Sequence, residues 1–220
     1  MSDSLAHCAR EARRRDRDRY LCALFAPMPA RSRLIALLAL DLELARIPRS
    51  VSEPLLGQLR LQWWREAVAA ARRGGAPAHP VAQALAETGA AGVFSEAGMA
   101  ALFSAHESVS DSFEDVGKRG AAQAALALDV LRIDDEPTRL AARHVGSAWA
   151  LVAAMQRHSL SEAMAPAAAH LAAAAALPTL RVARPALLPG VLAKAYLRRP
   201  RARLTPLGRQ LRLMIAYARG

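Results

Sequence analysis

Residues 16–68 read DRDRYLCALFAPMPARSRLIALLALDLELARIPRSVSEPLLGQLRLQWWREAV. The middle of this stretch, residues 31–47, is the most apolar run in the chain and predicts a buried helix. A charged helix is expected before it, over residues 4–25, because Pro27 and Pro29 make continuation between the two unfavourable. This part of the chain therefore predicts helices packed against one another.

The remaining sequence predicts further helices and no strand. Ser52 fits an N-cap and Pro54 fits the first turn of a helix that continues to about Arg73. After a linker at 74–80, helices are expected over 80–90, 95–110, 117–132, 136–157, 164–177, 190–199 and 205–218. The chain is 53% hydrophobic but only 5% aromatic, so its core consists mainly of small and aliphatic residues that favour helix. We predict an all-α fold, a single helical bundle of eight to ten helices spanning residues 1–220.

The positive charge is concentrated near the end of the sequence. Residues 181–220, called the basic segment below, contain ten Lys or Arg and no Asp or Glu. They supply +10 of the formal net charge of +11, so residues 1–180 contribute only +1. Such a segment favours an anionic partner, which could be a membrane surface, a nucleic acid or an acidic protein.

Other features bear on location. Cys8 and Cys22 lie in no metal-binding or disulfide motif, and the charged start of the chain lacks the apolar run of a signal peptide. The longest apolar stretch, residues 163–177, is too short and too weakly apolar to cross a bilayer. We expect a cytoplasmic protein.

Two acidic patterns could serve metal chemistry or helix capping. Asp111 and Asp115 stand four residues apart on one helical face, a spacing that can hold Mg²⁺. Ser112 is a competent cap for the same helix, and a diphosphate site requires two facing acidic clusters. The second pattern, residues 134–136, precedes a proline and fits capping equally well. We interpret both patterns as helix starts.

Histidine and tryptophan patterns favour packing over catalysis. The six histidines show no metal-binding spacing; His79 falls in the linker, and the others are expected on helix surfaces. Adjacent Trp63 and Trp64 point about 100° apart on a helix, so one is expected in the core and the other at its boundary. Ligand stacking on this pair is the less favoured interpretation.

The stretch 16–68 resembles the N-terminal region of squalene/phytoene synthases. In that family a tyrosine-bearing helix and an Arg-containing turn precede an apolar helix, and a helix with an LxWWRxxL pattern follows. Residues 141–160 are similar to the family's second conserved segment, and residues 187–199 are similar to one branch of it. The resemblance implies a terpenoid-synthase-like bundle whose ancestral activity is a head-to-head prenyl transfer assisted by Mg²⁺.

The departures from this family concern the metal ligands. Where the enzymes carry their first Asp-rich motif, this chain has Ala45, Arg46 and Arg49. Where they carry the second motif, it has Gln156, Arg157 and Ser161. Guanidinium groups repel a divalent cation that carboxylates would bind. We therefore expect no metal, no cofactor and no catalytic residues, and a protein that has lost prenyl transfer.

The run from Asp41 to Arg46 and the run from Val51 to Pro54 are similar to one branch of the family. That branch includes a mitochondrial complex I assembly factor and its proteobacterial relatives. The resemblance implies a non-catalytic helper that acts with respiratory complex I subunits, peripheral to the inner membrane.

A repurposed cavity would need ligand-binding residues. The candidates are Glu43, Arg46, Arg49, Arg60, Trp64 and Arg157. Their arginines could bind an anionic group, such as the headgroup of a phospholipid or the diphosphate of an isoprenoid, without a metal.

Two alternatives stay open. The chain could be an active prenyl diphosphate transferase that uses Asp111, Glu114, Asp115 and either Asp41 or Glu43 as substitute Mg²⁺ ligands. The basic segment could instead bind an acidic protein or RNA. Its only aromatic residues are Tyr196 and Tyr217, so base stacking is disfavoured and no nucleic acid is expected.

Overall fold

A computed structural model describes residues 2–50, 53–75, 78–108, 112–158, 161–200 and 204–219; at Arg49 and Ser50 it describes the backbone alone. Within these ranges the chain forms twelve α-helices and two short 3₁₀-helices, and no strand. The all-α prediction is confirmed. Two compact units divide the chain, Met1–Val109 (unit 1) and Ser110–Gly220 (unit 2). The single domain spanning 1–220 stays a prediction.

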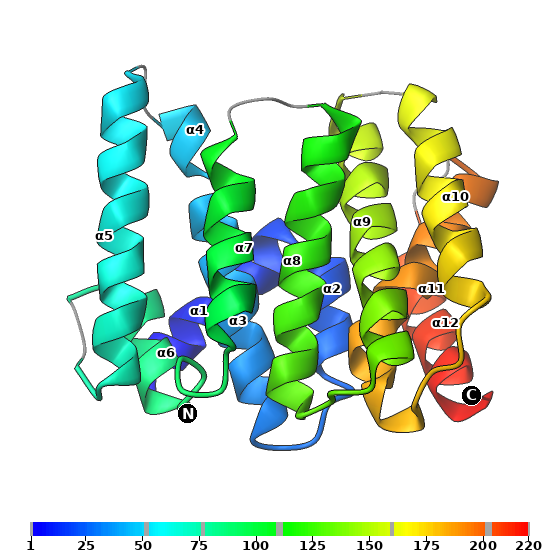
Figure 1. The fold of residues 1–220 in the computed structure, drawn as a ribbon. Coiled ribbons are helices and arrows are strands. Elements are labelled where there is room, and N and C mark those ends of the chain that lie inside the picture. Colours follow the sequence, from blue (N-terminus) through cyan, green and yellow to red (C-terminus); the bar gives the residue numbers. More distant parts are fainter. Residues whose placement is uncertain are drawn as a thin grey trace. The chain divides into compact units, whose positions relative to one another are not determined.

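The described residues of unit 1 form seven helices, and Figure 1 labels them. They are α1 (Asp3–Arg15), α2 (Arg17–Ala23), α3 (Ala30–Leu44), α4 (Ile47–Ser50), α5 (Pro54–Arg72), α6 (Pro80–Glu87) and α7 (Glu96–Glu107). The expectation of one helix over 4–25 is wrong, because Asp16 interrupts it. The Asp16 side chain accepts a hydrogen bond from the backbone N–H of Arg19 at 3.0 Å and so caps a second helix.

Helix α3 is the central helix of unit 1. It packs against α1, α2 and α6, and most of its residues between Leu34 and Leu44 are buried. A helix that is apolar on nearly all sides must be surrounded by other elements, which agrees with the unbroken apolar run in the sequence.

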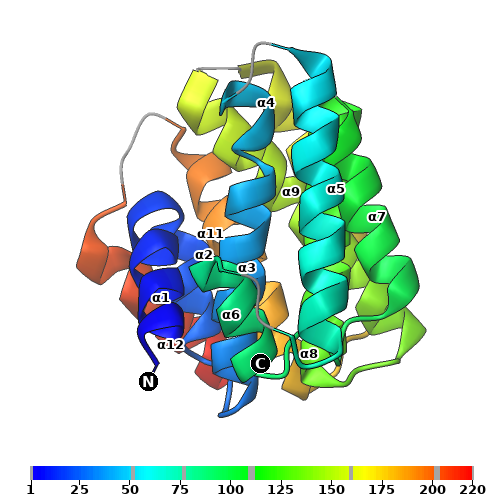
Figure 2. The same ribbon diagram turned by 90° about the vertical axis from the view of Figure 1, so that its left-hand side faces the viewer.

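Helix α5 follows α3 through the short α4, and Figure 2 shows the three in succession. Helix α5 packs against α6 and α7, and its Leu61, Trp64 and Val68 are buried. Its first half has an exposed surface that includes Leu55 and Leu59. Ser52, predicted as the N-cap, lies outside the described residues.

Unit 2 is built around its longest helix, α9, which packs against α8, α10 and α11. Its α-helices are α8 (Phe113–Leu131), α9 (Glu136–His158), α10 (Met164–Ala175), α11 (Arg184–Arg198) and α12 (Pro206–Arg219). The capping interpretations are confirmed: Ser112 Oγ accepts from the N–H of Asp115 at 3.1 Å, and Asp135 Oδ2 accepts from that of Thr138 at 2.9 Å. Asp111 lies outside the described residues.

Helix α11 begins earlier than predicted. It starts at Arg184 rather than near residue 190, and it continues through Pro189. The sequence favoured a break there because proline removes one helical hydrogen bond. Burial of Ala186, Leu188 and Gly190 in unit 2 stabilises the helix across that position.

Candidate functional site

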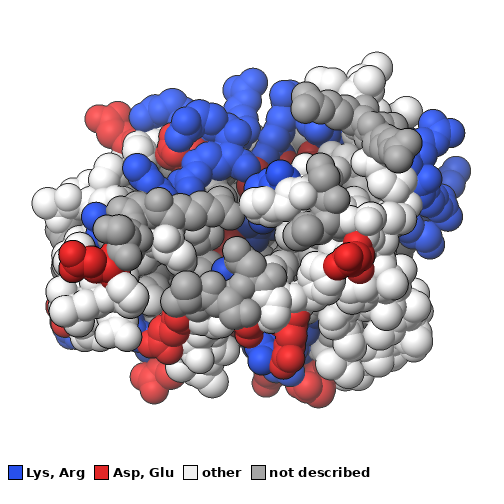
Figure 3. Space-filling model, turned by 90° about the horizontal axis from the view of Figure 1, so that it is seen from above, with Lys and Arg blue, Asp and Glu red and all other residues white. Residues whose placement is uncertain are grey.

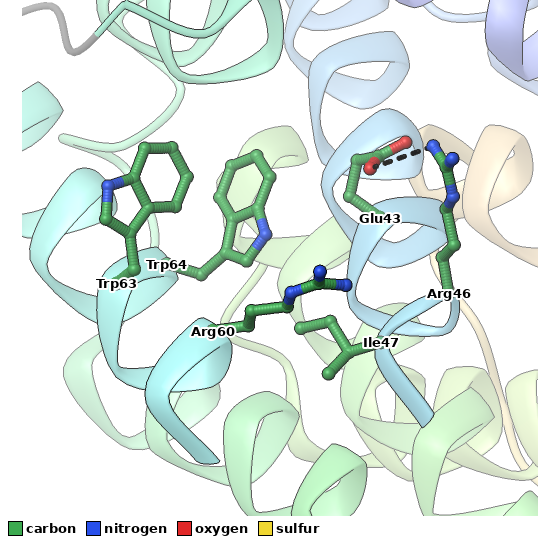
Figure 4. Close-up of a pocket in the computed structure, with 6 residues that line it drawn as sticks. All are labelled: Glu43, Arg46, Ile47, Arg60, Trp63 and Trp64. Carbon is green, nitrogen blue, oxygen red and sulfur yellow. Dashed lines mark ion pairs between the residues drawn. The ribbon is translucent and has the colours of Figure 1, made fainter. Parts of the chain in front are cut away.

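A pocket of about 410 Å³ lies in unit 1, where the end of α3 and the start of α4 face α5. Its lining residues are Glu43, Arg46, Ile47, Arg60, Trp63 and Trp64 (Figure 4). Glu43 and Arg46 come from the α3 side, whereas Trp63, Trp64 and Arg60 come from α5. The pocket therefore combines an aromatic wall with two guanidinium groups.

Trp63 and Trp64 form the aromatic wall of the pocket, and the His79 ring packs against them. Trp64 is 5% exposed and Trp63 is 42% exposed, which confirms the prediction of one core and one boundary tryptophan. The two rings meet edge to face with centroids 4.9 Å apart. The ring of His79 packs against that of Trp64, with the two centroids 4.8 Å apart. Burial lowers the pKa of His79, which favours its neutral form. His79 thus supports the wall while its side chain caps α6.

The two arginine side chains that line the pocket are exposed to solvent. The Arg46 side chain is 65% exposed, and its Nη1 is 4.0 Å from Glu43 Oε2, the outer limit of an ion pair. Arg60 is also exposed and extends from α5 toward the end of α3 (Figure 4). An anion entering the pocket would therefore meet one or both guanidinium groups without having to break a close Arg46–Glu43 pair.

The carboxylates near the pocket are engaged by other arginines. Arg15 Nη1 is 3.0 Å from Glu43 Oε1, and Arg15 Nη2 donates to the carbonyl of Leu42 at 3.0 Å. Asp41 is buried, with Oδ2 at 2.9 Å from Arg19 Nη1. Asp41 and Glu43, both near the end of α3, are thus each paired with an arginine of unit 1.

Asp41 also binds a histidine that the sequence placed on the surface. His106, on α7, is 3% exposed, and its Nε2 is 3.1 Å from Asp41 Oδ1. Burial by itself raises the pKa of Asp41, but Arg19 and His106 outweigh that effect and lower it to about 2. The surface expectation for His106 is therefore wrong, because this histidine completes a buried polar cluster with Asp41 and Arg19.

These residues do not suit the Mg²⁺ ion that the resemblance to squalene/phytoene synthases implies. Magnesium requires several free oxygen ligands, and a diphosphate site needs two acidic clusters. Among the described residues that line this pocket, Glu43 is the one carboxylate, and it is paired with Arg15. Across the described ranges, no group of three or more His, Cys, Asp or Glu is arranged to hold a metal ion.

The pocket brings together four of the six predicted ligand-binding residues: Glu43, Arg46, Arg60 and Trp64. The side chain of Arg49 lies outside the described part of the chain. Arg157 belongs to unit 2, where it is exposed near the end of α9. The prediction missed Trp63 and Ile47, although the paired tryptophans already marked this region.

Comparison with known proteins places the pocket within a recognised segment. Residues 12–115 match the family model described as squalene/phytoene synthase. This segment is similar to the squalene/phytoene synthase family. All six pocket residues lie inside the match.

A solved structure shares the fold of this chain. A crystal structure of a dehydrosqualene synthase in complex with ligand superposes with a TM-score of 0.72, at 12% identity, covering 98% of this chain and 95% of that one. The match confirms a terpenoid-synthase-like fold.

Three curated relatives carry the name NADH dehydrogenase (ubiquinone) complex I, assembly factor 6. The Bos taurus protein is 41% identical over 76 residues, which cover 34% of this chain and 23% of that protein. The Rattus norvegicus protein is 40% identical over 83 residues, covering 38% and 25%, and the Homo sapiens protein is 40% identical over 76, covering 34% and 23%. The aligned part thus spans about a quarter of each relative's length.

Proposed function

We propose that this chain is a non-catalytic squalene/phytoene synthase-like protein that acts in the assembly of respiratory NADH dehydrogenase. We further propose that its pocket binds an anionic lipid headgroup, or the diphosphate of an isoprenoid, without a metal ion. The resemblance to the family places Arg46, Arg49 and Arg157 where the enzymes carry acidic ligands, and complex I assembly factors are among the relatives. On this account the protein works at the surface of the membrane that holds the complex.

One observation carries the proposal. The pocket presents exposed Arg46 and Arg60, while its carboxylate Glu43 is already paired with Arg15. A bound phosphate would gain charge-assisted hydrogen bonds from the guanidinium groups. An attached apolar chain would contact the aromatic wall formed by Trp63 and Trp64.

The alternative, an active prenyl transferase, has less support. Asp41 and Glu43 would have to leave their arginine partners before they could bind Mg²⁺. In unit 2, Glu114 pairs with Lys118 at 2.7 Å, and Asp115 accepts a hydrogen bond from Ser112 Oγ at 2.8 Å. Each proposed substitute ligand that the structure describes therefore already forms an ion pair or a hydrogen bond within the chain.

Short-chain phosphatidylglycerol below its micelle concentration is the probe for the pocket. Quenching of tryptophan fluorescence, with EDTA present, measures binding because Trp63 and Trp64 line the site. We expect Arg46→Gln/Arg60→Gln to weaken binding about tenfold or more, since two charge-assisted contacts are lost. The control Arg13→Gln/Arg73→Gln removes the same charge from exposed positions of unit 1 outside the pocket and should bind like the parent. Equal weakening in both variants, or binding that requires Mg²⁺, would refute the proposed site.

The assembly role requires a separate test in the source organism. Deleting the gene should lower the amount of fully assembled NADH dehydrogenase on native gels, and the intact chain should restore it. Arg46→Gln/Arg60→Gln should restore it poorly, whereas Arg13→Gln/Arg73→Gln should restore it fully. Normal assembly of NADH dehydrogenase in the absence of the gene would contradict the proposed function.

A further inference from the structure

Helix α12 of unit 2 exposes a continuous apolar face. Leu207, Leu211 and Met214 recur at helical spacing and are 74%, 55% and 59% exposed, and Ile215 beside them is 40% exposed. Spacings of four and three residues place such side chains in one row along a helix. A row of large apolar side chains facing water is costly and points to a partner that covers it.

The opposite side of α12 is already packed. Leu213 is fully buried, α12 packs against α11, and Arg209 Nε donates to the hydroxyl of Tyr196 on α11 at 3.2 Å. Arg184 of α11 donates to the backbone carbonyl of Tyr217, and its guanidinium lies 5.8 Å from the centre of that ring. Helix α12 is therefore held in unit 2 through one face, and the apolar row is left for another contact.

Exposed cations lie on α12 and on the neighbouring α11. Arg212 and Arg219 are exposed on α12, and Lys194, Arg198 and Arg199 are exposed on α11. Lys and Arg side chains also gather in groups on another face, the upper one of Figure 1, as Figure 3 shows. The basic segment, residues 181–220, contains no Asp or Glu, so α11 and α12, which both lie within it, carry only positive side-chain charge.

We propose that α12 lies in the headgroup region of an anionic bilayer, with Leu207, Leu211, Met214 and Ile215 facing the acyl chains. This inference rests on the membrane location in the proposed function and names the surface that provides it. Apolar side chains insert while flanking cations bind lipid phosphates, the arrangement of interfacial amphipathic helices.

Other occupants fit the row less well. A second copy of α12 would bring two uniformly cationic segments together, which electrostatic repulsion opposes. At 14 residues the helix is about 21 Å long, short of the roughly 30 Å hydrocarbon core, so it would lie along the membrane. No helix within the described ranges is long and apolar enough to cross a bilayer.

Flotation with vesicles tests this inference on the full chain. Vesicles of equimolar phosphatidylglycerol and phosphatidylcholine are compared with vesicles of phosphatidylcholine alone. We expect the parent to bind the anionic vesicles, and Leu211→Gln/Met214→Gln to bind them about tenfold less, because two inserted side chains are lost. High salt should weaken the parent without abolishing its binding.

The matched control is Leu55→Gln/Leu59→Gln, which removes two exposed apolar side chains from α5. It should bind like the parent, and circular dichroism confirms that both variants remain folded. Parent-like binding by Leu211→Gln/Met214→Gln would overturn the insertion of α12 and leave a purely electrostatic attachment by the basic segment. Failure of the parent to bind anionic vesicles would overturn both the inference and the membrane location, and would favour an acidic protein as the partner. Neither result bears on the soluble-lipid test of the pocket.

Discussion

Replacing Gly120 by alanine should lower the free energy of unfolding by about 3 kcal/mol, because the new methyl group has no space. Helices α8 and α9 cross at Gly120 and Gly146. A Cβ built on Gly120 would lie 2.1 Å from the carbonyl oxygen of Gly146, and a Cβ on Gly146 would lie 2.2 Å from that of Gly120. Both obstacles are backbone atoms, so the two helices would have to move apart. Urea denaturation measures the loss.

Gly117→Ala is the matched control on the same helix. A Cβ there would lie 3.6 Å from Ser147 Oγ, an ordinary contact. Alanine favours helix over glycine, so this variant should be unchanged or more stable by up to about 1 kcal/mol. Equal stability of Gly117→Ala and Gly120→Ala would show that the close crossing of α8 and α9 is wrong.

Asp41→Asn should cost about 3 kcal/mol, since it leaves Arg19 in a mostly buried position without this counter-charge. The Arg19 side chain is 16% exposed and retains Asp16 at 2.7 Å, which keeps the loss from being larger. The control Arg46→Gln removes an exposed arginine 4.0 Å from Glu43 and should change stability by less than about 0.5 kcal/mol. A small effect of Asp41→Asn in urea denaturation would contradict the described cluster.

The same variant should alter the response to acid. Because the pKa of Asp41 is lowered from 3.8 to about 2, its ionisation stabilises the fold above pH 3.8, and that contribution is lost as the pH falls through 2. The stability difference between the parent and Asp41→Asn should therefore shrink by about 2 kcal/mol between pH 5 and pH 2. A difference that stays constant over this range would show that Asp41 has an ordinary pKa.

The sequence was sufficient for the fold because its signals are local. Apolar runs, capping residues and prolines predicted most helices, including α5 from Pro54 to Arg72 against an expected end near Arg73. Of two differences from the prediction, the first has a local cause and the second a tertiary one. Asp16 caps a second helix within a run that reads as one, and tertiary burial carries α11 through Pro189.

The candidate site was predicted only in part, because its remaining features depend on distant residues. Arg46, Arg60 and Trp64 were found through the resemblance to a family, and the pocket brings them together. The pairing of Asp41 with His106 joins residues 65 positions apart, and no spacing pattern encodes it. His79 was assigned to a linker, although it also packs against Trp64.

Electrostatics connects these observations. A divalent cation at the end of α3 would need free carboxylates as ligands. Asp41 and Glu43, however, each have an arginine nitrogen within about 3 Å. The adjoining pocket instead presents Arg46 and Arg60 to solvent. This charge distribution favours the binding of an anion over its metal-assisted departure.

Release of pyrophosphate is the measurement that tests this claim most directly. The purified chain is incubated with farnesyl or geranylgeranyl diphosphate and Mg²⁺, beside a control without protein. The account predicts identical rates in both, because Asp41 and Glu43 are paired with arginines and are not free to hold the metal. Release that depends on both the protein and Mg²⁺ would contradict it.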